Sequence, residues 1–101
     1  MQTVLMTGQT TTATGSSAMV QQTTAQRTYQ ATVLGSGAQT ATVIIEGSNE
    51  NINFLTLGTI TLSGTTTASD GFASKAAWVF VRARLTAISG TGATVTVVMG
   101  S

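Results

Sequence analysis

Apolar and polar side chains alternate with a period of two over most of the sequence from Thr28 onward. A helix would repeat apolar residues at intervals of three and four, and no long window does so. Alternation rich in Val, Ile and Thr is typical of strands that bury one face, so the chain is predicted to be all-β. The residues predicted to face the core are Tyr29, Ala31, Val33, Ala41, Val43, Ile45, Ile52, Phe54, Ile60, Leu62, Ala93, Val95, Val97 and Met99.

Turn-forming residues interrupt this alternation at short, regular intervals. Clusters rich in Gly, Ser, Asn and Thr occupy residues 35–39, 47–51, 63–71 and 89–92. The spacing leaves no room for crossover helices, and only residues 69–77 would accommodate a helical turn. The pattern predicts an antiparallel β-sandwich of about seven or eight strands, including one or two around Leu5 and Val20.

The N-terminal region has a different composition from the rest of the chain. Residues 7–18 are almost entirely Thr, Ser, Gly, Gln and Ala. Such a segment buries too little apolar area to offset the entropy lost when it becomes ordered. We therefore predict a flexible arm over residues 1–17 and one β-sandwich domain over residues 18–101. The arm is either mobile or ordered against a neighbouring subunit, with Val4, Leu5 and Met6 as an anchor.

Charge is scarce in this chain. It has four Lys or Arg and three Asp or Glu among 101 residues, with a net charge of +1, whereas about a quarter of residues are charged in a typical domain. Nucleic-acid binding needs many basic contacts, so no nucleic-acid partner is expected. A weakly charged surface, in a chain that also lacks Pro, is poorly protected against association. These features favour a protein that works inside an assembly.

No segment of the sequence indicates a membrane protein or a secreted one. No apolar run approaches the roughly 20 residues that span a bilayer, and the first ten residues lack a basic region followed by a long apolar one. We expect no membrane partner and synthesis in the cytoplasm.

The residues that usually carry catalysis are sparse. The chain has no His and no Cys, and its acids are Glu46, Glu50 and Asp70, far apart in sequence. Glu46 and Glu50 flank a Gly-Ser-Asn turn, where acids usually face water. Residues 48–51 would supply at most a weak Ca²⁺ site, and a plain turn is favoured. The glycine-rich pieces lack the context of a phosphate-binding loop. We expect no enzymatic activity, no catalytic residues, no metal and no cofactor.

Two arginines, Arg82 and Arg84, interrupt an apolar strand near the C-terminus. In a strand they share one face with Trp78 and Phe80, and these residue types are enriched at the centres of protein interfaces. Three interpretations stay open: a contact with another subunit, a face closed within the chain by pairing with Glu46 or Asp70, and a nucleic-acid contact. The candidate interface residues are Trp78, Phe80, Arg82, Arg84, Val4 and Leu5.

Four segments resemble small structural proteins of tailed bacteriophages: VIIEGSNE, LGTITLSGT, SDGFAS and AWVFVRARLTAISGTGATVTVVMG. The resemblance runs from about Thr28 to the C-terminus and is closest to head decoration or cement proteins. It implies a compact, jelly-roll-like β-sandwich without catalytic residues.

The resemblance also implies partners. We expect a virion protein that binds the major capsid protein on the outer shell and self-associates as a trimer or dimer. The alternatives are another virion component, in the tail or at the head–tail junction, and a glycan- or receptor-binding module on the virion surface.

Overall fold

The computed structural model describes residues 2–15, 17–19, 27–74 and 78–100, and these residues contain strands and no helix. The strands are β1 (Gln2–Gln9), β2 (Ala13–Thr14), β3 (Ala18–Met19), β4 (Arg27–Ser48), β5 (Leu55–Ser74) and β6 (Phe80–Gly100). All pairs are antiparallel, and they form one sheet in the order β1-β6-β4-β5, with β2 and β3 also paired to β6. The prediction of an all-β, antiparallel fold is confirmed. No helix long and apolar enough to cross a membrane occurs in this described part.

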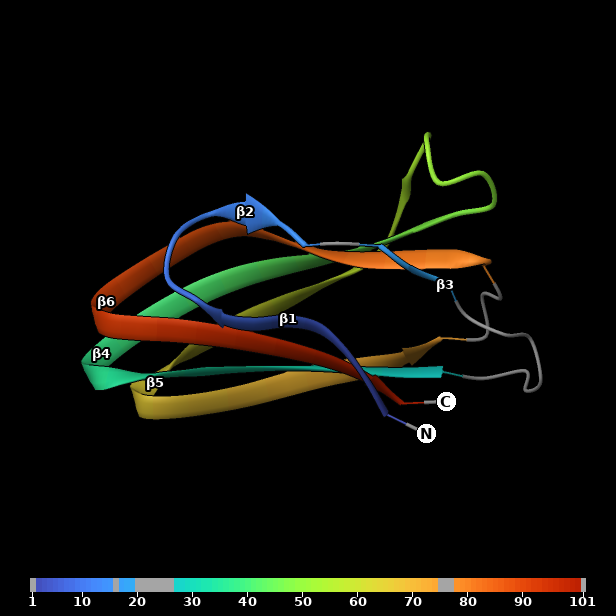
Figure 1. Ribbon diagram of the computed structural model, residues 1–101. Coiled ribbons are helices and arrows are strands. Elements are labelled where there is room, and N and C mark those ends of the chain that lie inside the picture. The colour runs from blue at the N-terminus through green and yellow to red at the C-terminus, as the bar shows by residue number, and fades with distance from the viewer. Residues whose placement is uncertain (1, 16, 20–26, 75–77, 101) are drawn as a thin grey trace.

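The three long strands are bent. A straight strand of 22 residues would span roughly 70 Å, but the longest dimension of the molecule is 40 Å. In Figure 1, β4, β5 and β6 turn back together at one end, so the sheet folds over itself into two layers. We call this end the bend, and the end where the long strands begin and finish the open end. The loop of residues 49–54 projects at the open end (Figure 1).

Backbone irregularities in all three strands produce the bend. The pairing register shifts between Leu34 and Ala38 in β4, and between Ser36 and Thr40 against β6. Opposite these shifts, Thr66 of β5 and Gly90 of β6 have φ values of 78° and 124°, a region that L side chains rarely adopt. Residues 35–39, 63–71 and 89–92 therefore lie within strands, and the prediction that they separate strands is wrong.

The expected count of seven or eight separate strands is not confirmed, because each long strand contributes to both layers. The predicted helical turn is also wrong at residues 69–74, which belong to β5; residues 75–77 lie outside the described part. Val20, expected near an early strand, lies outside it as well. The remaining predicted break, at residues 47–51, does become a loop after Ser48.

One hydrophobic core lies between the two layers. On β4, Tyr29, Ala31 and Val33 from one half of the strand and Val43 and Ile45 from the other are all buried in it. The predicted core positions on β5 and β6 are likewise buried: Ile60, Leu62, Ala93, Val95, Val97 and Met99. Alternation thus identified the buried face of both layers. On the outer faces, cross-strand hydroxyls pair, as in Thr32 with Ser69 at 2.8 Å.

Two predicted core residues lie outside the core. Ile52 is 77% exposed and Phe54 is half-buried, because both belong to the loop before β5. The segment predicted to be an arm begins with a strand. Residues 2–9 form β1 along β6, and Leu5 and Met6 are buried. The three apolar residues expected to anchor the arm therefore lie in β1.

Candidate interaction surface

The candidate interface residues fall into two groups in the structure. Phe80, Arg82 and Arg84 alternate with buried residues on the first half of β6, so they face outward from one layer. Val4 is 56% exposed on β1, opposite Val98 in the second half of β6, and so belongs to the other layer. Leu5 is buried in the core. The structure therefore brings the arginines and Phe80 together, and separates them from Val4 and Leu5.

A buried carboxylate lies between the two arginines. Glu46 of β4 is directly opposite Arg82 of β6, and Arg82 Nε donates a hydrogen bond of 2.8 Å to Glu46 Oε1. Arg84 Nε lies 3.4 Å from Glu46 Oε2. This second contact is an ionic attraction without hydrogen-bond geometry, because Arg84 Nε has no hydrogen-bond partner among the described residues. Of the three interpretations, the structure contains the pairing within the chain, between the two arginines and Glu46.

Burial distinguishes Glu46 from the other acids. Glu46 is 7% exposed, so the prediction that it faces water is wrong, whereas Glu50 is exposed in the loop. Burying a carboxylate is costly unless it is paired, and two guanidinium groups offset that cost here. Arg82 and Arg84 keep 28% and 41% of their side-chain surface exposed. Their outer edges therefore stay available for contact even though their charges are paired.

An aromatic ring covers the ion pair. The guanidinium carbon of Arg82 lies 3.8 Å from the centroid of the Phe54 ring, which is a close cation–π geometry. Phe54 ends the loop of residues 49–54, so this contact fixes the end of the loop against the outer face of β6. We call Glu46, Phe54, Arg82 and Arg84 the ion cluster. Sequence reasoning missed the role of Phe54, since nothing in a separation of 28 residues signals the stacking.

Hydrogen bonds to Ser48 shape the start of the same loop. Ser48 Oγ accepts bonds from the backbone N–H groups of Glu50 and Asn51, at 3.2 and 3.0 Å. Asn53 Nδ2 donates to Glu50 Oε1 at 2.5 Å. The Glu50 carboxylate is therefore used inside the turn. Within the described residues, no group of three or more acidic, His or Cys side chains is placed to hold a metal ion.

Trp78 belongs to the same end of the molecule but precedes β6. It packs on Gly47 so closely that a Cβ atom at residue 47 would lie 2.7 Å from the Trp78 ring atom Cγ. Its carbonyl accepts a hydrogen bond of 3.0 Å from Arg27 Nη1. Arg27, at the start of β4, is itself buried. Glycine at residue 47 thus leaves room for the indole, and Arg27 holds the segment that leads into β6.

Exposed apolar side chains also lie at the open end. Ile52 and Leu55 are 77% and 57% exposed, and Val79 is 40% exposed. The backbone N–H of Val79 donates to Asn49 Oδ1 at 3.5 Å, which places the segment before β6 beside the loop. We call Ile52, Leu55 and Val79 the apolar tip. Together with the ion cluster it forms the candidate interaction surface.

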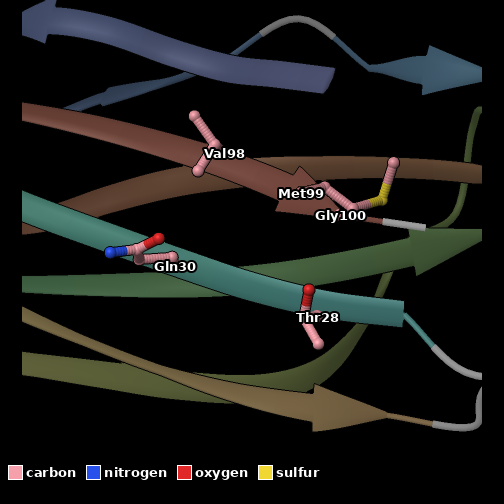
Figure 2. Close-up of a pocket in the computed structure, with 5 residues that line it drawn as sticks. All are labelled: Thr28, Gln30, Val98, Met99 and Gly100. Carbon is pink, nitrogen blue, oxygen red and sulfur yellow. The ribbon is translucent and has the colours of Figure 1, made fainter. Parts of the chain in front are cut away.

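The structure also has an open depression of about 250 Å³ elsewhere. Figure 2 shows that Thr28 and Gln30 of β4 and Val98, Met99 and Gly100 of β6 line it. Gln30 is paired with Val98 and Thr28 with Gly100 across the two strands. A Cβ atom at Gly100 would lie 2.7 Å from Thr28 Oγ1, so the two residues approach closely there. The lining of the depression is neutral.

Comparison of the chain with protein-family models, curated proteins and solved structures found no match.

Proposed function

We propose that the chain is a non-enzymatic structural protein of a phage virion, which decorates or cements the outer capsid by binding the major capsid protein. The observation that carries the proposal is the apolar tip: Ile52 is exposed on the loop of residues 49–54, which the contact of Phe54 with Arg82 holds at its end, and Leu55 and Val79 are exposed at the start of β5 and directly before β6. Exposed apolar clusters rimmed by polar groups are typical of protein contact sites. A loop that is already ordered also loses less entropy on binding.

The polar rim of this surface is supplied by the outer edges of Arg82 and Arg84. Arginine and aromatic residues are enriched among the residues that contribute most to binding energy, and Phe80 lies beside them on β6. Many copies around a symmetric shell would add their contacts, and self-association as a trimer or dimer would add more.

The proposal also covers the finer fold class and the location of the protein. It includes the jelly-roll-like sandwich of head decoration proteins, which is supported by the two layers around one core. It also includes a location on the capsid surface after synthesis in the host cytoplasm.

Adding the protein back to capsids that lack it would test this proposal. Capsids are prepared from a phage strain in which the gene is deleted, mixed with purified protein and sedimented through sucrose. We expect saturable co-sedimentation and a higher temperature of shell disruption. Absence of the protein from the capsid fraction at every concentration would contradict the proposal.

A matched pair of variants locates the contact. Ile52→Ser should weaken capsid binding roughly tenfold, the equivalent of one well-buried anchor. Leu34→Ser is the control, because Leu34 is also exposed, at 53%, but lies beside the bend. Equal losses in the two variants would show that the apolar tip has no special role.

A further inference from the structure

The strand β5 forms a long edge of the sheet. Among the described strands it pairs only with β4, so the hydrogen-bonding groups on its other side have no strand partner. Residues 55–69 contain no charged residue, and the chain contains no Pro. Edge strands are normally protected by charges, prolines, bulges or short length. Over the 15 residues 55–69, this edge has neither charged residues nor prolines.

The opposite side of the sheet is protected. There β1 has eight residues, and its register against β6 shifts twice, between Val4 and Met6 and between Met6 and Gln9. Among the described residues, the strands on this side of the first half of β6 are β2 and β3, with two residues each. Short and irregular edges are poor templates for a further strand. The pairing of β5 with β4 also shifts, opposite Leu34/Ala38 and Ile45/Glu46, but it is regular from Gly58 to Thr65. This part of β5 is therefore the edge suited to pairing.

We propose that a second copy of this chain pairs with β5 in antiparallel fashion, with the two-fold axis at Thr61. In this register Thr59 of one copy is opposite Ser63 of the other, and Ile60 is opposite Leu62. Gly58 is opposite Gly64, so the two residues without side chains face each other. Each of the other residues between them is then opposite a residue with a side chain. The pairing joins the two sheets into one through residues 57–65.

The faces of the strand favour a second copy as the partner. Ile60 and Leu62 point into the core, whereas Thr59, Thr61 and Ser63 are exposed. An antiparallel pair centred on Thr61 keeps inward residues opposite inward residues, so the two cores become continuous. Because the segment is uncharged, the two-fold axis brings no like charges together. The proposal does not depend on capsid binding.

Disulfide trapping tests both the pairing and its register. The chain has no Cys, so Thr61→Cys introduces a single thiol. Directly opposite Cβ atoms in an antiparallel pair are about 4.5–5.5 Å apart, close enough for a disulfide after a small adjustment. Residue 59 and its own copy would be offset by about 13 Å along the strands, which is too far.

We therefore expect Thr61→Cys to form a covalent dimer at least tenfold faster than Thr59→Cys under mild oxidation. Thr7→Cys is the second control, since Thr7 is exposed on the other edge strand, β1. Faster trapping at residue 59 would overturn the register. No difference among the three variants would overturn the pairing itself.

Charge substitution gives an independent measurement without a covalent bond. Thr61→Lys and Thr61→Glu should each be monomeric by light scattering, because the axis would bring like charges together. An equimolar mixture should restore a species of twice 10.2 kDa. Unchanged circular dichroism would confirm that each variant is folded. A monomeric or trimeric wild-type protein at millimolar concentration would contradict the two-fold pairing.

Discussion

The open end and the bend of the folded sheet differ in whether their buried polar side chains have partners. At the open end, a buried charge is paired: Glu46 with Arg82 and Arg84. At the bend, Gln39 is 3% exposed, yet neither polar atom of its side chain has a hydrogen-bond partner among the described residues. The open end therefore uses polar contacts to hold loops, whereas the bend is imposed by backbone geometry and tight packing.

The two ends should therefore be destabilised by different kinds of substitution. The open end is vulnerable to the loss of one partner of its buried ion pair. The bend depends on glycines with positive φ values, and one of them, Gly90, is also closely surrounded. Substitutions at the two ends should consequently differ in size and even in sign.

The largest effect is expected at Gly90 in the bend. Its φ is 124°, and a Cβ there would lie 2.7 Å from the Cβ of Gln39. Gly90→Ala combines backbone strain with overpacking and should lower the free energy of unfolding by about 3–4 kcal/mol. Gly92→Ala is the matched control, because Gly92 has a φ of 67° and nothing within 4 Å of its Cβ position. It should lose about 1 kcal/mol in urea denaturation. Equal losses would show that crowding does not shape the bend.

At the open end, Glu46→Gln should lower the free energy of unfolding by about 2 kcal/mol, because it leaves two guanidinium groups without their carboxylate. Proteolysis within residues 49–54 should become faster, since Phe54 loses a fixed Arg82 to stack on. Glu50→Gln provides the control, as Glu50 is exposed in the same loop, and its stability should change by less than about 0.5 kcal/mol. A similar loss in both variants would mean that burial of Glu46 is irrelevant.

Removing the polar atoms of Gln39 should have the opposite sign. Gln39→Met keeps the length of the side chain and removes two buried groups without partners, so stability should rise by about 1 kcal/mol. Chemical denaturation of the variant and the wild-type protein would measure the change. A loss of stability would show that the Gln39 amide is satisfied, for example by a bound water.

The smallest effect concerns Tyr29 at the open end and appears only in alkali. Burial raises the pKa of Tyr29 above its usual 10, and the charge of Arg27 opposes this change. Above pH 10 the unfolded chain loses the tyrosine proton first, so stability should fall as pH rises through 10 and be unaffected below about pH 9. Tyr29→Phe should flatten this part of the profile. Because Tyr29 is the single tyrosine, its absorbance titration reports the pKa directly, and a midpoint below 10 would contradict the burial.

The sequence was sufficient to predict most of the core within the long strands, but not the path of the chain. Alternation marks Val43 and Ile45 as buried regardless of where a strand turns. The Gly-Ser clusters at residues 35–39 and 89–92, however, have the same local chemistry in a hairpin and in a bend. Whether such a cluster forms a hairpin or a bend depends on the strands that pair with it, and the local sequence does not specify those strands.

The candidate site was partly predictable for the same reason. Pairing of Arg82 or Arg84 with Glu46 or Asp70 was one of the open alternatives, and the structure has Glu46 directly opposite Arg82. The contact of Phe54 with Arg82 depends on how the loop returns to the sheet, and no spacing indicates it. The burial of Leu5 likewise depends on β6, which is distant in sequence.

The most direct measurement is hydrogen exchange of the protein free in solution and bound to capsids. If the apolar tip and the ion cluster form the contact surface, binding should slow exchange in residues 49–55 and 78–84 and leave the bend unchanged. Slower exchange at residues 35–37 and 89–92, with none at the open end, would contradict that assignment.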